Sequence, residues 1–168
     1  MILQIDTAAL TLTADGVATP CRIGRSGAVA ASAKREGDGA TPLGTFALRE
    51  ALLRPDRGFA APVTALPWRW LDPADGWSDD PADPEYNTRI HLPHPFSAEH
   101  LWRDDGLHDV IVPIGYNDAP PVAGHGSAIF LHCTVPGHPV TAGCVAIDRE
   151  ALLALLPFLH PGDAIAIR

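Results

Sequence analysis

The chain has 168 residues, of which 46% are apolar and 19% are charged, and its formal net charge is −8. This length and composition predict one globular domain over residues 1–168 with a sizeable buried core. The negative charge and the lack of any run of Lys and Arg exclude a nucleic-acid-binding role, which needs clustered cations. No stretch reaches the roughly 18–20 consecutive apolar residues of a membrane span.

Fifteen glycines and 17 prolines favour many short elements over long helices. In the first third of the chain, apolar stretches between turn residues predict strands at 2–5, 9–12, 17–23, 27–33 and 45–53. Residues 62–95 are rich in Pro, Asp and Trp without a clear period, and we expect a long structured loop there. Ser97 to His100 are expected to form a short helical turn.

The second half of the chain predicts further strands at 109–114, 127–133, 145–147 and 164–167. Asp148 is a favourable N-cap for a helix across residues 149–155. The sequence therefore predicts a mainly β fold, a sandwich or partly closed barrel, with one or two short helices.

The residues with the clearest chemistry lie in the last third of the chain. His132 ends an apolar strand, and Cys144 follows Gly143 twelve positions later. A thiol near its ordinary pKa is mostly protonated at neutral pH, and a histidine within reach can take that proton. A glycine before the cysteine lets the backbone turn, so that the N–H groups of Gly143 and Cys144 can face a bound carbonyl oxygen.

Each of these residues also has an ordinary structural interpretation. Cys144 could be a buried thiol, His132 a satisfied core histidine and Gly143 a turn glycine. A metal site is a further alternative, because His125, Cys133 and His138 lie close by in sequence. The gaps between these residues match no familiar zinc spacing, so we expect no metal. Acyl transfer by a thiol and a histidine also implies no organic cofactor.

Several segments together resemble the YkuD-type L,D-transpeptidases. His132 with the stretch 141–145 (Thr-Ala-Gly-Cys-Val) is similar to the catalytic signature of that family, and residues 37–46 resemble its Thr-Pro-x-Gly-x-Phe segment. Residues 77–87, 102–103 and 115–117 resemble one bacterial subgroup. The chain departs from the family pattern at Ala146, where many members have Arg or Asn, and at Cys133, where glycine is common.

The resemblance implies a β-rich fold and roles for particular residues. Cys144 would be the nucleophile, His132 the base, oriented by a backbone carbonyl, and Gly143 part of the oxyanion site. Five residues are candidates for contact with substrate: Thr141, Tyr86, Asn87, Trp102 and Asn117. For the last four, a purely structural role is an equally good alternative to substrate contact.

The resemblance also implies the substrate, which is a peptidoglycan stem peptide. A thioester would form on Cys144, and an amine on another stem would then attack it to give an L,D-type crosslink. Two alternatives remain: an L,D-carboxypeptidase, in which water resolves the same thioester, and a non-catalytic cell-wall-binding domain with a groove in the Trp- and Tyr-rich stretch 68–116.

The start of the chain bears on localisation. Met1 to Asp6 lack the basic and long apolar regions of a signal peptide and are predicted to form a strand. The family implies the periplasm or cell envelope. The lack of signal-peptide features leaves a cytoplasmic location open as an alternative. We expect a monomer. If Cys144 is free, Cys21 and Cys133 form the one possible disulfide, and Cys21 is better explained as a core residue.

Overall fold

A computed structural model describes all 168 residues of the chain, and most of its regular structure is β-strand. The strands are β1 (Ile2–Asp6), β2 (Thr11–Ala14), β3 (Val17–Arg22), β4 (Ala28–Ala30), β5 (Thr41–Ala47), β6 (Ala51–Leu53), β7 (Trp68–Trp70), β8 (Asp75–Ser78), β9 (Arg89–His91), β10 (Ala98–His100), β11 (Val110–Pro113), β12 (Phe130–Cys133), β13 (Val145–Ile147) and β14 (Ala164–Ile167). One α-helix, α1, spans Arg149–Leu155, and short 3-10 helices cover Ala31–Ala33, Pro55–Arg57 and Leu156–Phe158. The prediction of a mainly β fold is confirmed.

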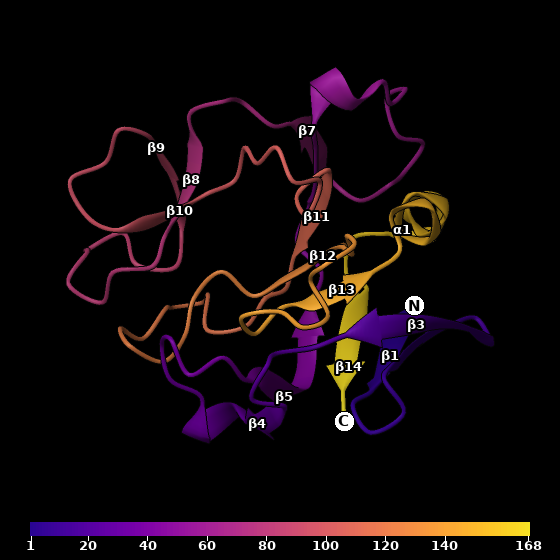
Figure 1. Cartoon of the computed structure of the whole chain (residues 1–168), viewed down its shortest axis with the longest axis horizontal. Helices are drawn as coiled ribbons and strands as arrows, with labels where there is room; N and C mark the ends of the chain where they lie inside the picture. The colour runs from indigo at the N-terminus through magenta and orange to yellow at the C-terminus, as the bar shows by residue number, and fades with distance from the viewer.

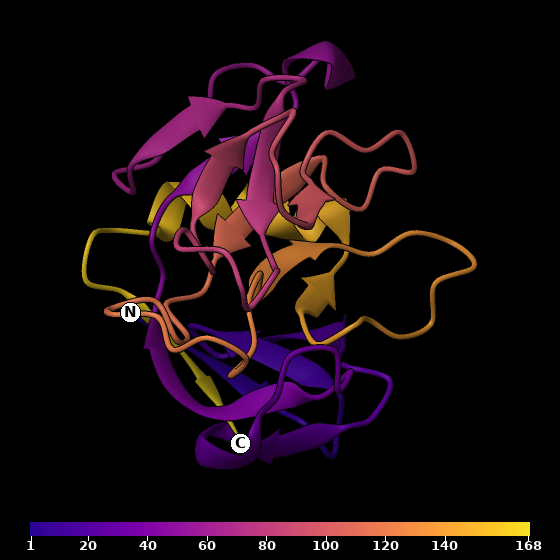
Figure 2. The ribbon, with the colours of Figure 1, turned by 90° about the vertical axis from the view of Figure 1, so that its left-hand side faces the viewer.

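The strands form two sheets. Eleven of them make one mixed sheet in the order β4-β5-β14-β1-β2-β3-β13-β12-β11-β6-β7, and three form a smaller sheet in the order β10-β8-β9. Figures 1 and 2 show the small sheet at the upper end of the molecule and the N-terminal strands at the lower end. Buried side chains from both halves of the long sheet share one core, so this sheet curls around it.

Alternation along β12 divides its side chains between two faces of the long sheet. Leu131 and Cys133 lie in the main core, whereas Phe130 belongs to a smaller apolar cluster on the opposite face. Trp77 of β8 packs edge-on against Phe130, with ring centroids 5.2 Å apart. The small sheet therefore covers this second face, and His132 points to the same side as Phe130.

Helix α1 begins where the sequence predicts it. The Asp148 carboxylate accepts hydrogen bonds from the N–H groups of Glu150 and Ala151, at 2.9 and 3.2 Å. These bonds satisfy two of the N–H groups that a helix start leaves free. Leu152 is buried against the main core, so capping and packing together fix this short helix.

Two segments differ from the expectation. Residues 62–95 are not one long loop, because they contain β7, β8 and β9. The predicted helical turn at 97–100 is wrong, since this segment forms β10 and pairs antiparallel with β8, Glu99 lying opposite Trp77. Strands of three or four residues gain their order from cross-strand pairs, which no local pattern reveals.

All three cysteines are free thiols, so the one disulfide that the sequence allows, between Cys21 and Cys133, is not formed. Both of these residues lie buried in the main core.

None of the helices has the length and apolar character needed to cross a membrane.

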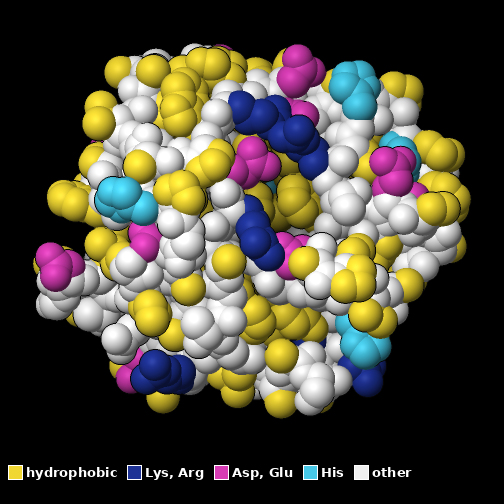
Figure 3. Space-filling view, turned by 180° about the vertical axis from the view of Figure 1, so that it is seen from behind, with side chains coloured by type: hydrophobic (Ala, Val, Ile, Leu, Met, Phe, Trp, Pro, Cys, Tyr) yellow, Lys and Arg dark blue, Asp and Glu magenta, His cyan; other side chains and the backbone are white.

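The back of the molecule carries a hollow that both basic and acidic side chains surround (Figure 3). Its charged lining residues are Arg49, Glu50, Arg89 and Asp118.

Candidate active site

The two residues with the clearest chemistry meet through the pairing of β12 with β13. These strands run parallel, with Leu131 beside Val145 and His132 beside Ala146. Because side chains alternate along a strand, Cys144 and Ala146 project to the same face as His132. Cys144 and His132 are therefore diagonal neighbours on the face that the small sheet covers, and both line one cavity.

The Cys144 thiol sits among backbone groups of the preceding strand. Its sulfur donates to the Ala128 carbonyl oxygen at 3.2 Å and accepts from the Phe130 N–H at 3.4 Å. Burial, with a smaller contribution from the nearby Glu99 carboxylate, raises the pKa of this thiol to about 12. The sulfur is thus held as a thiol, and its ionisation requires a base.

His132 is the candidate for that base. The side chain is buried, and its Nδ1 donates to the Cys133 carbonyl oxygen at 2.9 Å. This bond fixes the tautomer and leaves Nε2 as the nitrogen with a free lone pair. Burial lowers the pKa of His132 to about 4, so the imidazole is neutral at physiological pH. A neutral imidazole can accept the thiol proton.

The turn before Cys144 is closed by Thr141. The Thr141 hydroxyl donates to the Cys144 carbonyl oxygen at 2.7 Å and accepts from the Gly143 N–H at 3.1 Å. Gly143 has φ +141°, and a side chain there would approach the Ala40 carbonyl oxygen at 3.0 Å, so only glycine suits the position. Of the two expected oxyanion donors, the Cys144 N–H has no partner in the chain, whereas the Gly143 N–H is engaged.

Loops from the N-terminal half support this turn. The Thr41 hydroxyl accepts from the Gly24 N–H at 2.8 Å and lies 3.4 Å from the Cys144 carbonyl oxygen. Gly24 also forms a bridge to Thr141. The Asp38 carboxylate accepts from the N–H groups of Arg35 and Ala40, which fixes the turn before Thr41. The glycine-rich stretch 37–39 is thus a structural turn.

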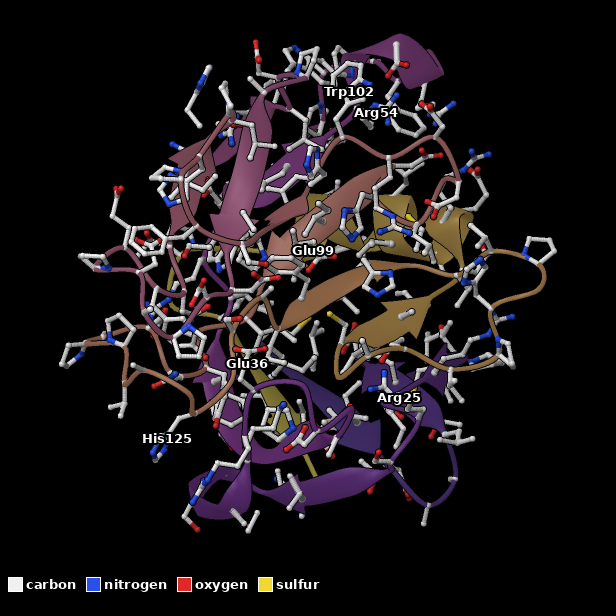
Figure 4. The ribbon with its side chains drawn as sticks, turned by 60° about the vertical axis from the view of Figure 1, so that its left-hand side comes forward. Arg25, Glu36, Arg54, Glu99, Trp102 and His125 are labelled. Atoms are coloured by element: carbon white, nitrogen blue, oxygen red, sulfur yellow. The ribbon has the colours of Figure 1, made fainter.

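The cavity in front of Cys144 has a volume of about 340 Å³ and mixes charges of both signs. Its basic lining residues are Arg22, Arg25, Lys34 and Arg103, and its acidic ones are Glu36, Asp79 and Glu99. Figure 4 shows Glu99 descending from the upper strands toward the loops that carry Glu36 and Arg25. Thr141 and His138 also line the cavity, whereas His125 points away at the edge of the molecule.

The other four residues expected to contact substrate do not line this cavity. Tyr86 is buried and its hydroxyl donates to Glu36. Asn87 accepts from the Trp77 indole N–H at 2.9 Å and from the Ala128 N–H at 3.0 Å, and it borders the hollow on the back face. The Asn117 amide donates to the carbonyl oxygens of its own loop. These side chains hold loops in place, so their structural alternative is the better explanation.

Trp102 lies at the top of the molecule beside Arg54 (Figure 4). The Arg54 guanidinium, on a side chain only 1% exposed, stacks 3.8 Å from the centre of the Trp102 ring. Trp102→Leu should therefore destabilise the fold by about 2 kcal/mol through lost packing and cation–π contact. Calorimetry should show the lower melting temperature, while the rate of Cys144 acylation stays within about twofold. A slower reaction without loss of stability would instead place Trp102 in substrate binding.

Sequence reasoning missed Glu99 and His108, which both line the cavity. His108 is buried, and its ring centroid lies 5.7 Å from that of His132. Glu99 stands in a three-residue strand that the local pattern does not reveal, and His108 precedes β11 by two positions. Only the packing of the small sheet onto β12 brings them to the site, and no sequence spacing encodes it.

One cluster outside the cavity has metal-ligating chemistry. The ligand atoms of Asp83, Glu85 and His94 lie within 4.8 Å of one another. Asp83 is already bonded, because its carboxylate accepts from the Ser78 hydroxyl at 2.5 Å and from the His94 ring at 2.6 Å. These contacts explain the cluster as the framework of the loop between β8 and β9.

Comparison with known proteins places the chain. The YkuD family model, described as an L,D-transpeptidase catalytic domain, matches residues 2–167. No curated protein sequence matches. Among solved structures, Bd1075 of Bdellovibrio bacteriovorus has a TM-score of 0.50 and 16% identity, over 99% of this chain and 47% of that one.

Two mycobacterial structures are also similar. An L,D-transpeptidase from Mycobacterium smegmatis has a TM-score of 0.45 at 15% identity, covering 99% of this chain and 58% of that one. L,D-transpeptidase 3 from Mycobacterium tuberculosis has a TM-score of 0.46 at 14% identity, covering 99% of this chain and 60% of that one. This chain thus spans about half the length of the solved proteins it matches. The family match over nearly all its residues shows that the protein belongs to the YkuD L,D-transpeptidase catalytic domain family.

Proposed function

We propose that this protein is a cysteine acyltransferase that acts on peptidoglycan stem peptides as an L,D-transpeptidase. The observation that carries the proposal is the placement of Cys144 and His132 as diagonal neighbours on one face of two parallel strands, at the floor of one cavity. Membership of the family supports the substrate class, and the thiol with a candidate base on the same face supports the reaction class.

In this mechanism His132 accepts the proton of the Cys144 thiol, and the sulfur attacks a peptide carbonyl of the donor stem. The Cys144 N–H supports the proposal as a donor to the resulting oxyanion. His132 then gives the proton to the leaving amine, and a thioester remains on Cys144. An amine of a second stem attacks this thioester, and the thiol is restored.

The test is mass spectrometry of the intact protein after incubation with a tetrapeptide stem and, separately, with a carbapenem. We expect a covalent adduct with each, located by fragmentation to Cys144. Cys21 and Cys133 provide internal controls, because both thiols are buried in the main core and neither lines the cavity. Folded protein that forms no adduct, or an adduct elsewhere, would overturn the proposal.

The same experiment separates the two alternatives. A thioester that releases only a hydrolysed tripeptide, even with an amine acceptor present, would indicate an L,D-carboxypeptidase. A protein that retains the stem peptide without any covalent bond would be a cell-wall-binding domain. Transfer of the acyl group to the added amine is the result that we expect.

A further inference from the structure

Glu99 lines the cavity, and its carboxylate accepts no hydrogen bond from the rest of the chain. It lies on β10, and no side chain or backbone N–H donates a hydrogen bond to it. The nearest titratable side chain is the neutral His108 ring, whose Nε2 lies 3.5 Å from the Glu99 carboxylate oxygen. The Glu99 side chain is 30% exposed and lines the cavity that holds Cys144, so its carboxylate is open to a molecule bound there.

The small sheet determines which groups surround Glu99. Glu99 of β10 lies opposite Trp77 of β8, so their side chains share one face of the small sheet. Asp79 follows Trp77 by two positions and projects to this same face. Trp77 packs on Phe130, so this face lies directly over β12. The charged and titratable groups near Glu99 are Asp79 after β8, Arg103 and His108 between β10 and β11, Glu36 in the loop before β5, and Cys144 before β13.

The transfer reaction leaves one proton that the Cys144–His132 pair does not handle. When the donor amide breaks, the thiol proton passes through His132 to the leaving amine. That amine becomes the ammonium of a free amino acid by binding a second proton. The acceptor arrives as an ammonium and must lose one proton before its nitrogen can attack. Its second proton returns to the Cys144 sulfur through His132.

We propose that Glu99 is the acid–base group that carries this second proton, giving it to the leaving amine and taking it from the incoming ammonium. This proposal rests on the proposed transferase function. The atoms balance over one cycle. Glu99 is neutral before donor cleavage and ionised in the thioester state, and the incoming ammonium restores its proton before the C–N bond forms and the C–S bond breaks.

The electrostatics of the cavity agree with this role. Burial raises the pKa of Glu99 to about 7, Arg103 opposes this rise, and the carboxylates of Asp79 and Glu36 add to it. A group that must be an acid in one half-reaction and a base in the next works best with a pKa near the working pH. His108 stays neutral beside it, because burial lowers the pKa of His108 to about 3.

The test compares Glu99→Gln with the wild type in each half-reaction. Ring opening of a carbapenem expels no free amine, so Glu99→Gln should form that adduct within about threefold of the wild-type rate. Acylation by a tetrapeptide and transfer of its acyl group to an amine should each fall at least tenfold at pH 7. Glu150→Gln, on the exposed face of α1, is the matched control and should change none of these rates.

The pH dependence provides a readout that a purely structural role would not change. The rate of thioester aminolysis rises steadily with pH as more of the acceptor amine is unprotonated. The wild-type rate should show an additional inflection near pH 7, and this inflection should be absent in Glu99→Gln. Asp79→Asn removes a negative charge near Glu99. This removal favours the ionised form of Glu99 and lowers its pKa, so the inflection should move to lower pH. Unchanged transfer rates and pH profile in Glu99→Gln would overturn this inference, whereas wild-type protein without any adduct would overturn the transferase function itself.

Discussion

His132→Gln is expected to slow acylation of Cys144 about a thousandfold at pH 7, which corresponds to about 4 kcal/mol of transition-state stabilisation. Burial raises the pKa of the Cys144 thiol to about 12, so without a base almost no thiolate is present. A glutamine side chain can occupy the same position in the strand, but it is not basic enough to accept the thiol proton. Stopped-flow measurement of carbapenem adduct formation gives the rate directly.

The pH profile distinguishes loss of the base from simple misplacement of the thiol. In the wild type, His132 has a pKa of about 4, so its basic form is complete above that pH and the rate should be flat from about pH 5 to 8. The rate should fall only as the pH drops toward 4 and the imidazole becomes protonated. In His132→Gln, thiolate forms by loss of the proton to solvent, and the rate should rise about tenfold per pH unit.

His125→Gln is the matched control, because His125 does not line the cavity and points away from it in Figure 4. It should leave both the rate and the flat profile unchanged. A His132→Gln variant with a rate near that of the wild type would mean that another group deprotonates Cys144.

Cys144 and His132 could be proposed as a catalytic pair from sequence because each signal is local. The sequence shows His132 near the end of an apolar strand and Cys144 directly before the next one, and the parallel register of the two strands then brings both side chains to one face. The N-cap at Asp148 is local in the same sense, since its carboxylate bonds to residues two and three positions on. Patterns within one strand or one helical turn are legible without a structure.

The cavity wall could not be read in this way. Glu99 and Asp79 line the cavity of Cys144 only because a three-stranded sheet of short strands folds over β12, and those strands have no distinctive pattern. In the alternative of a cell-wall-binding domain, aromatic residues of the stretch 68–116 line a groove, yet Trp77 and Trp102 fix that sheet and its loop by packing on Phe130 and Arg54. Residue type alone does not distinguish an aromatic side chain that binds substrate from one that supports the site.

Gly24→Ala is expected to lower the free energy of unfolding by about 3 kcal/mol, through overlap with backbone that cannot move freely. A methyl group on Gly24 would lie 2.2 Å from the Gly39 carbonyl oxygen and 3.0 Å from the Ala40 carbonyl carbon. The chain must then separate the loop at 24 from the turn before Thr41. Calorimetry should show a melting temperature lower by roughly 8 °C.

This displacement should also reach the nucleophile. Gly24 donates to the Thr41 hydroxyl and bridges Thr141, and both threonines contact the Cys144 carbonyl oxygen. Acylation should therefore slow at least tenfold at temperatures where Gly24→Ala is still folded, since small misplacements of a reacting group are costly. Gly27→Ala is the control: Gly27 has φ +76° and no atom within 4 Å of the added methyl, so it should cost only about 1 kcal/mol of backbone strain. Equal rates in the two variants would show that the N-terminal loops do not position Cys144.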